Sequence, residues 1–223
     1  MFGSREASNS FFIRKQGDKL AAAFLIFLAV CLFGLPAEAK YGGGTGEPND
    51  PYQIWTAEQM NAIGAEPNDW DKHFKLMADI DLAQYTGEQF NIIGTSGSVP
   101  FTGVFDGDGH AISNFECSVV DMSIVGLFGR VSGENAQIKN LRLVGPAIYA
   151  DTEDYVGSLI GYNHGGTITA CSVENGIVLG NEKVGGLIGV NVYGFITECF
   201  STANVSGATE VGGLVGANTN KIM

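Results

Sequence analysis

One short phrase, Val-Gly-x-Leu-x-Gly, recurs in the second half of this chain of 223 residues. Copies begin at Val156, Val184 and Val211, and a copy that is one residue shorter begins at Val125. The four copies end at Gly129, Gly161, Gly189 and Gly216. The steps between these glycines are 32, 28 and 27 residues. A nearly constant period of this length is typical of a solenoid, a propeller or another repeat array.

Composition selects among these architectures. Each glycine inside a helix costs about 1 kcal/mol, so the paired glycines of the phrase argue against helical repeats. The residues around the phrase are rich in Val, Ile, Thr and Phe, which favour strands. A propeller blade needs about 40 to 45 residues, which is longer than the period found here. The sequence therefore predicts an all-β fold, a parallel β-solenoid, and we expect each coil to contain two or three short strands.

Stacked coils place equivalent residues directly above one another, about 4.8 Å apart, so each repeat position forms a ladder. The 32 glycines, about twice the usual share of about 7%, are expected where a corner needs a positive φ or a close approach of two backbones. A second phrase, Ile-x-x-apolar, begins at Ile112, Ile138, Ile168 and Ile196, and we expect these residues to stack. The other predicted ladder positions are Leu159, Asn163, Cys171, Gly186, Leu187, Asn191, Cys199, Gly213, Leu214 and Asn218.

The first 39 residues have the pattern of a secretory signal peptide. Basic residues precede an uncharged apolar run from Leu20 to Leu35, which is shorter than the roughly 20 residues of a membrane-spanning helix. Ala37-Glu38-Ala39 then gives a small-x-small cleavage pattern. We expect a protein that is secreted or displayed at the cell surface, without a membrane segment after cleavage; an uncleaved N-terminal anchor is the alternative.

Residues 40–100 are predicted to form an N-terminal cap and the first strands, and residues 101–223 to form the repeats. A short helix is expected near residues 56–64, with Thr56 as its N-cap and Gly64 at its end, and this helix could plug the open end of the solenoid. The last repeat stops after Asn218, before its partner phrase recurs. We therefore expect the repeats to be C-terminally incomplete and the chain to be part of a longer protein.

Charge and motifs exclude several classes of function. The formal net charge is −12 and the few Lys and Arg residues are scattered, so neither nucleic acid nor an anionic membrane is an expected partner. No H-E-x-x-H, C-x-x-C or nucleophile-elbow motif is present. Asp106 and Asp108, beside His110, could hold Ca²⁺, although Asp-Gly pairs more simply make tight turns. No other cofactor is expected. Cys171 and Cys199 are predicted to be buried free thiols, with a disulfide between them as the alternative.

Two stretches resemble a known family motif. Gly186-Leu187-Ile188-Gly189 and Gly213-Leu214-Val215-Gly216, each followed closely by an asparagine, are similar to the GLUG motif. The upstream segments 50–54, 74–82 and 101–112 resemble the leader that often precedes such repeats. The resemblance implies a right-handed parallel β-helix and an extracellular role. The motif recurs in bacterial secreted and surface proteins, among them adhesin-like chains and the non-catalytic part of some immunoglobulin-cleaving metallopeptidases.

Three functions are compatible with the sequence. The first is a non-catalytic repeat module for cell-surface adhesion, binding or spacing, with an extracellular protein or glycan surface as partner. The second is the non-catalytic leader of a larger secreted peptidase. The third is a polysaccharide-cleaving β-helix enzyme, which needs carboxylates and basic residues along one groove. Lys and Arg are few, and we expect Arg130 and Arg142 to lack acidic partners at matching coil positions. The sequence thus favours a protein that is not an enzyme.

Overall fold

A computed structural model describes residues 40–95, 99–120 and 122–219. The predicted signal peptide at residues 1–39 and the last four residues lie outside the described part of the chain. From Tyr41 onward the described residues form one compact unit.

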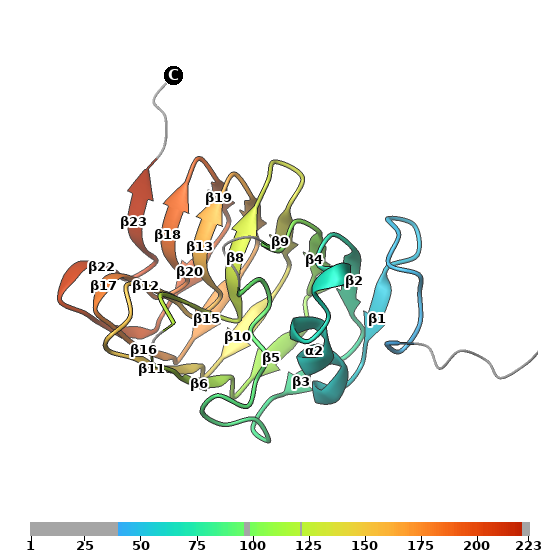
Figure 1. Ribbon diagram of the computed structural model, residues 1–223, viewed down its shortest axis with the longest axis horizontal. Coiled ribbons are helices and arrows are strands. Elements are labelled where there is room, and N and C mark those ends of the chain that lie inside the picture. The colour runs from blue at the N-terminus through green and yellow to red at the C-terminus, as the bar shows by residue number, and fades with distance from the viewer. Residues whose placement is uncertain (1–39, 96–98, 121, 220–223) are drawn as a thin grey trace, which may run out of the picture. The chain divides into compact units, whose positions relative to one another are not determined.

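The compact unit is a stack of coils made of short strands (Figure 1). The first coil contains β1 (Tyr52–Ile54), the helix α2 (Ala57–Gly64) and a 3-10 helix (Pro67–Asp69). The second contains β2 (His73–Leu76) and β3 (Ile80–Asp81). The third contains β4 (Val104–Asp106), β5 (Ala111–Ser113), β6 (Glu116–Ser118), β7 (Ile124–Val125) and β8 (Phe128–Ser132).

Three further coils have five strands each. The fourth coil contains β9 (Gln137–Lys139), β10 (Arg142–Val144), β11 (Ala147–Ala150), β12 (Tyr155–Gly157) and β13 (Ile160–His164). The fifth contains β14 (Thr167–Thr169), β15 (Ser172–Glu174), β16 (Ile177–Gly180), β17 (Glu182–Gly185) and β18 (Ile188–Val192). The sixth contains β19 (Phe195–Thr197), β20 (Phe200–Ser201), β21 (Asn204–Ser206), β22 (Thr209–Gly212) and β23 (Val215–Thr219).

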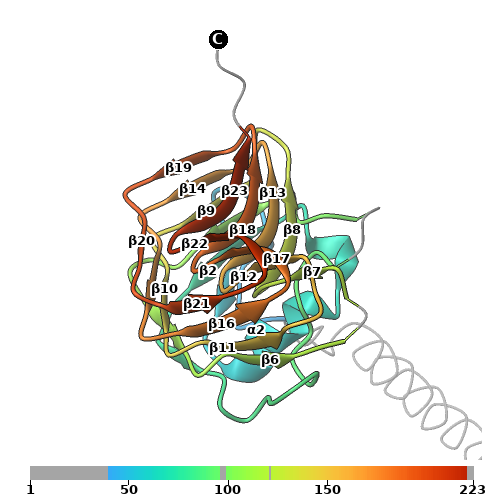
Figure 2. The ribbon, with the colours of Figure 1, turned by 90° about the vertical axis from the view of Figure 1, so that its left-hand side faces the viewer.

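Strands of successive coils pair in five parallel sheets, which line the sides of the stack (Figure 2). In the order in which a coil visits them, sheet 1 is β1-β2-β4-β9-β14-β19, sheet 2 is β3-β5-β10-β15-β20, sheet 3 is β6-β11-β16-β21, sheet 4 is β7-β12-β17-β22 and sheet 5 is β8-β13-β18-β23. The predicted parallel β-solenoid is confirmed. The expectation of two or three strands per coil was wrong. Each full coil has five strands, because corner residues with a left-handed backbone, such as Asn140 (φ 54°) and Asn175 (φ 56°), divide it.

The register follows the period of the sequence. Ile138, Ile168 and Ile196 pair in sheet 1, and Ile160 pairs with Ile188 in sheet 5. The backbone N–H of Leu159 donates to the carbonyl of Leu187 at 3.0 Å. Leu187 in turn donates to the carbonyl of Leu214 at 2.9 Å. The side chains of these residues fill one continuous core, since a single coil cannot bury its own apolar side.

The placement of Ile112 in the isoleucine ladder was wrong. Ile112 pairs with Leu143 and Ile80 in sheet 2, whereas Phe105 pairs with Ile138 in sheet 1. Each coil contains several units of one short strand followed by a corner, and they share a similar apolar spacing. A four-residue pattern therefore cannot identify the sheet to which its isoleucine belongs.

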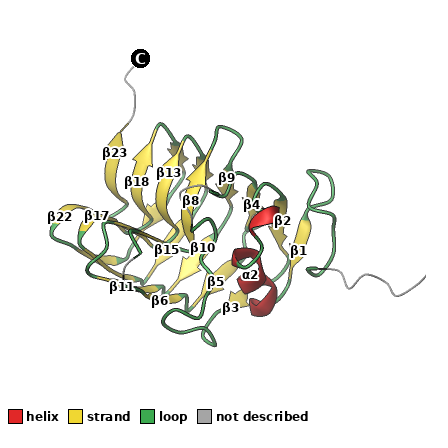
Figure 3. Cartoon of the chain, in the orientation of Figure 1, coloured by secondary structure: helices red, strands yellow, loops and turns green. Residues whose placement is uncertain are grey.

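The N-terminal helix α2 lies beside the second coil (Figure 3). The hydroxyl of Thr56 accepts a hydrogen bond from the backbone N–H of Gln59 at 3.3 Å, as expected of an N-cap. Met60 and Ile63 are fully buried and join the solenoid core. The predicted boundary between the cap and the repeats lies after residue 100. Sheet 1 is not interrupted there, because β2 before the boundary pairs directly with β4 after it. The solenoid thus begins before the repeats that the sequence makes obvious.

A buried asparagine ladder runs through sheet 5. The amide nitrogen Nδ2 of Asn163 donates to Oδ1 of Asn191 at 2.8 Å and to the carbonyl of Gly166 at 3.0 Å. Asn191 repeats the pattern, since its Nδ2 donates to Oδ1 of Asn218 at 2.9 Å and to the carbonyl of Gly194 at 3.0 Å. Each asparagine therefore ties one coil to the next and also holds the turn that leaves its own strand.

Replacing Asn191 with alanine tests the ladder. The buried Asn163 and the exposed Asn218 would each lose a partner, and the Gly194 carbonyl would lose a donor. We expect a loss of about 2 kcal/mol in the free energy of unfolding, measured by urea denaturation. Asn204→Ala, the same change at an exposed site on β21, is the control and should have little effect. Equal effects at both sites would contradict a structural role for the ladder.

The glycines of the repeated phrase allow the backbones of adjacent coils to approach closely. A Cβ atom added to Gly185 would lie 1.9 Å from the carbonyl oxygen of Ile188 and 2.7 Å from the backbone nitrogen of Gly216. Neither Gly185 nor its repeat partner Gly157 has a positive φ. Close approach, and not left-handed backbone, is therefore the reason for glycine at this corner.

Gly185 and Gly213 belong to different copies of the repeated phrase, and replacing each with alanine gives two substitutions that can be compared. Gly185→Ala should destabilise the protein by about 3 kcal/mol, because the nearest atoms belong to backbone that cannot move aside. A Cβ added to Gly213 would meet no atom within 4 Å, so Gly213→Ala should be neutral or slightly stabilising. Thermal and urea unfolding of the two variants will measure the difference. If Gly185→Ala were tolerated as well as Gly213→Ala, the explanation by close approach would be wrong.

Candidate functional site

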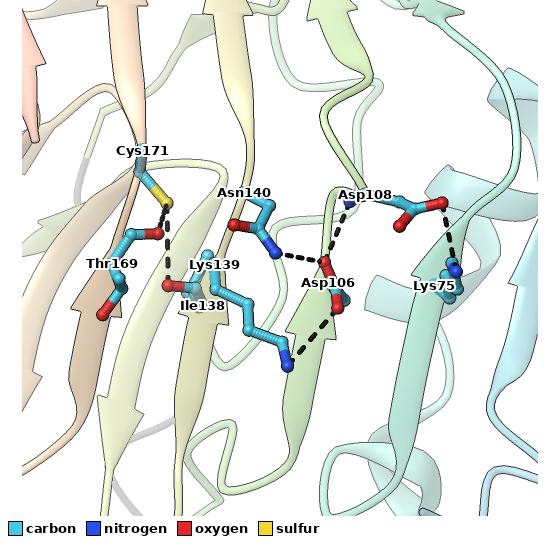
Figure 4. Close-up of polar contacts among 8 residues, drawn as sticks. All are labelled: Lys75, Asp106, Asp108, Ile138, Lys139, Asn140, Thr169 and Cys171. Atoms are coloured by element: carbon cyan, nitrogen blue, oxygen red, sulfur yellow. Dashed lines mark hydrogen bonds and ion pairs between the residues drawn. The ribbon is translucent and has the colours of Figure 1, made fainter. Parts of the chain in front are cut away.

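The aspartates proposed as calcium ligands lie at the corner between sheets 1 and 2 (Figure 4). Oδ1 of Asp106 accepts hydrogen bonds from Nδ2 of Asn140 at 3.0 Å and from the backbone N–H of Asp108 at 2.9 Å. Nζ of Lys139 lies 3.4 Å from Oδ2 of Asp106. The carboxylate of Asp108 points the other way, and its Oδ2 lies 3.0 Å from Nζ of Lys75. Each carboxylate is thus paired with a lysine from an adjacent coil.

These contacts keep Asp106 ionised. Burial acts to raise the pKa of Asp106, but the hydrogen bonds from Asn140 and Asp108 and the charge of Lys139 outweigh it, and the pKa is lowered. Within the described part of the chain, no three His, Cys, Asp or Glu side chains gather as a metal site requires. Calcium binding at Asp106 and Asp108 stays a prediction, and a cation there would compete with both lysines.

A second polar row follows along sheet 2. Oδ1 of Asp79 lies 3.1 Å from Nδ1 of His110 and accepts from the backbone N–H of Ala111 at 2.9 Å, and these contacts lower the pKa of Asp79. Nε of Arg142 lies 3.2 Å from Oε1 of Glu174, which belongs to the next coil. The residue that stacks on Arg142 is Ser172, so the matching coil position holds no acidic residue, as expected. The partner sits two residues beyond the position that stacks on Arg142.

The three described cysteines, Cys117, Cys171 and Cys199, are free thiols. Cys171 and Cys199 occupy equivalent positions of adjacent coils, just before the paired residues Ser172 and Phe200. The neighbouring thiol of Cys199 and burial raise the pKa of Cys171, whereas the neighbouring thiol of Cys171 lowers the pKa of the more exposed Cys199. Burial, with the charges of nearby glutamates, raises the pKa of Cys117 to about 12. The prediction of a buried thiol was wrong for Cys199, which is only partly buried because it belongs to the last described coil. We therefore expect Cys199 to be the most reactive of the three thiols.

Alkylation of the folded protein tests this order. At pH 8 we expect iodoacetamide to modify Cys199 first, because the thiolate is the nucleophile and Cys199 is both more acidic and more accessible than the other two. Peptide mass spectrometry will assign the modified residue, and Cys199→Ser should abolish the rapid phase. Modification of Cys117 at the same rate would contradict the assignment.

A groove that the sequence motifs did not predict lies across the turns between sheets 5 and 1. Its volume is about 510 Å³, and it is lined by Ser132, Gly133, Glu134, His164, Gly165, Thr167, Tyr193 and Phe195. Tyr193 and Phe195 are 51% and 68% exposed. The ring of Tyr193 meets that of His164 edge to face, with the ring centroids 5.9 Å apart. The groove combines aromatic surface with hydroxyl, imidazole and carboxylate groups, which is the usual make-up of a ligand site.

Comparison with known proteins identifies a family motif in this chain and several similar proteins. The model of the GLUG motif matches residues 153–178, which run from the turn before β12 to the start of β16. This chain contains a GLUG motif. The match covers one repeat, and the strands of adjacent coils pair with it in register.

Two relatives of this GLUG-motif protein are much longer than the chain. A protein of Evansella cellulosilytica, provisionally named a Gly-rich membrane protein, is 36% identical over 204 residues. The match covers 88% of this chain and 23% of that protein. Halomucin of Haloquadratum walsbyi is 32% identical over 183 residues, covering 78% of this chain and 2% of halomucin. The chain thus spans less than a quarter of either relative.

A solved structure shares the fold. The crystal structure of a protein from Bacteroides ovatus, provisionally assigned as an immunoglobulin A1 protease, superposes with a TM-score of 0.54. The match has 24% identity and covers 80% of this chain and 65% of that one. Among the described residues of the GLUG-motif protein, no helix is long and apolar enough to cross a membrane.

Proposed function

We propose that this chain is a non-catalytic segment of a secreted or cell-surface protein, a stiff solenoid that holds a binding groove away from the cell. Adhesion to an extracellular partner and spacing are the two roles that such a segment combines. The in-register pairing of all five sheets supports the spacer role, because each coil is fixed by continuous backbone hydrogen bonds to the next.

The observation that carries the binding role is the backbone of Tyr193. Its φ is +57°, a left-handed conformation that costs a bulky L-residue about 1 to 2 kcal/mol. The equivalent positions of the two preceding coils hold Gly133 and Gly165, which adopt positive φ at low cost. A strained and half-exposed aromatic residue adds little to the stability of the fold, so we assign it to contact with a partner.

The relatives support surface display. One carries the name of a membrane protein, and both are several times longer than this chain, as expected of proteins in which a solenoid is one segment among others. The alternative, the non-catalytic leader of a larger peptidase, draws its support from the Bacteroides ovatus structure, which has a similar fold and is provisionally assigned as an immunoglobulin A1 protease.

The polysaccharide-cleaving alternative is less well supported. The basic residues of the polar rows, Lys75, Lys139 and Arg142, are each paired with a carboxylate. A cation engaged in this way has to leave its partner before it can act on a substrate. We therefore keep the non-catalytic module as the proposed function.

Surface display is tested on intact cells of the organism that encodes the chain. A membrane-impermeant amine reagent should label the lysines of the solenoid, for example Lys72 and Lys183, which are partly exposed, before the cells are opened. A cytoplasmic protein serves as the control and should be labelled only after lysis. Labelling of the solenoid only after lysis would show that the proposed location is wrong.

A further inference from the structure

We propose that the groove between sheets 5 and 1 binds a neutral saccharide, with the face of one hexopyranose ring stacked on the aromatic wall formed by Tyr193 and Phe195. This inference rests on the proposed binding role and adds the ligand class to it.

Three consecutive turns build the groove. The turn from β8 to β9 is the longest of the three, with four residues between the strands, and it raises Glu134 as one wall. The turn from β13 to β14 has only two residues, Gly165 and Gly166, and forms the floor. The turn from β18 to β19 carries Tyr193 and forms the opposite wall together with Phe195. Figure 2 shows how these strands stack, with β9, β14 and β19 in one layer and β8, β13 and β18 in another.

The aromatic wall departs from the repeat at two positions. Tyr193 occupies a place where the preceding coils have glycine, as the hydrogen bonds from Gly133 to His164 and from Gly165 to Val192 establish. Phe195 pairs with Thr167, which in turn pairs with Gln137, so the residues at this position in the two preceding coils are polar. Two aromatic residues thus replace small or polar ones in the same turn. Both line the groove together with Gly165, which has no side chain to fill it.

The chemistry of the lining suits a sugar. The C–H face of a pyranose ring is apolar and packs on an aromatic ring, while its hydroxyl groups radiate outward and need hydrogen-bond partners. Ser132, Thr167 and His164 can donate or accept such bonds, and the carboxylate of Glu134 can accept them. A volume of about 510 Å³ accommodates one or two sugar units.

The charges of the groove lining and of the whole chain favour a neutral ligand. None of the eight described residues that line the groove is Lys or Arg, and one of them is a glutamate. The chain as a whole carries a formal net charge of −12. Sulfated, phosphorylated or uronic-acid glycans would therefore be repelled, and a neutral hexose or an N-acetylated hexosamine is the ligand class that remains.

The decisive experiment is binding of the full chain to an array of neutral, sialylated and sulfated glycans, followed by titration calorimetry with the neutral mono- and disaccharides that are retained. We expect retention of neutral glycans. Tyr193→Gly and Phe195→Thr each restore the residue of the preceding coil, so the fold should be preserved, and each should weaken binding at least tenfold. Unfolding midpoints of both variants will show that they are folded.

Phe200→Ser is the matched control. Phe200 is 52% exposed, lies outside the groove and pairs with Ser172 of the preceding coil, so this change also restores a repeat residue. It should leave saccharide affinity unchanged. Retention of anionic glycans alone, retention of no glycan at all, or full affinity in Tyr193→Gly would each overturn the inference. Labelling on intact cells is independent of these outcomes, so failure of the ligand assignment and failure of the surface role are separable.

Discussion

In-register pairing between successive coils is the constraint on which the rest of the structure depends. A strand residue stacks on the equivalent residue one coil earlier, so Ile138, Ile168 and Ile196 face the same interior. Where two backbones meet at a corner, as at Gly157 and Gly185, no side chain fits in any coil. The repeats in the sequence are the result, since one geometric demand is met again at each level of the stack.

This constraint explains why the fold could be predicted and where prediction failed. The spacing of Leu159, Leu187 and Leu214 places them one coil apart, and the structure joins them by backbone hydrogen bonds. Ile112 was assigned to the wrong sheet because the unit of a short strand and a corner recurs within a coil as well as between coils. The period reports the length of a coil, whereas the number of corners depends on local backbone such as the positive φ of Asn140, which the apolar pattern does not encode.

The polar features were less accessible to sequence reasoning. Asp106 and Asp108 were recognisable as acids in a glycine-rich turn, but their lysine partners come from different coils, Lys139 from the following one and Lys75 from the preceding one. Such pairs appear only when the register of each turn is known. The groove matched no motif. A column-by-column alignment of the coils would have revealed it, because Tyr193 stands in a column that otherwise holds glycine.

A solenoid separates the residues that stabilise it from the residues that can vary. The interior columns and the asparagine ladder of Asn163 and Asn191 hold the stack, and a change there affects both neighbouring coils. An outer turn contacts solvent, so a costly residue such as Tyr193 affects mainly its own coil. A strain of about 1 to 2 kcal/mol at one turn is small beside the burial of core residues along the whole stack, which contribute roughly 1.5 to 3 kcal/mol each. New binding surfaces can therefore arise at the turns of such a protein while its core remains unchanged.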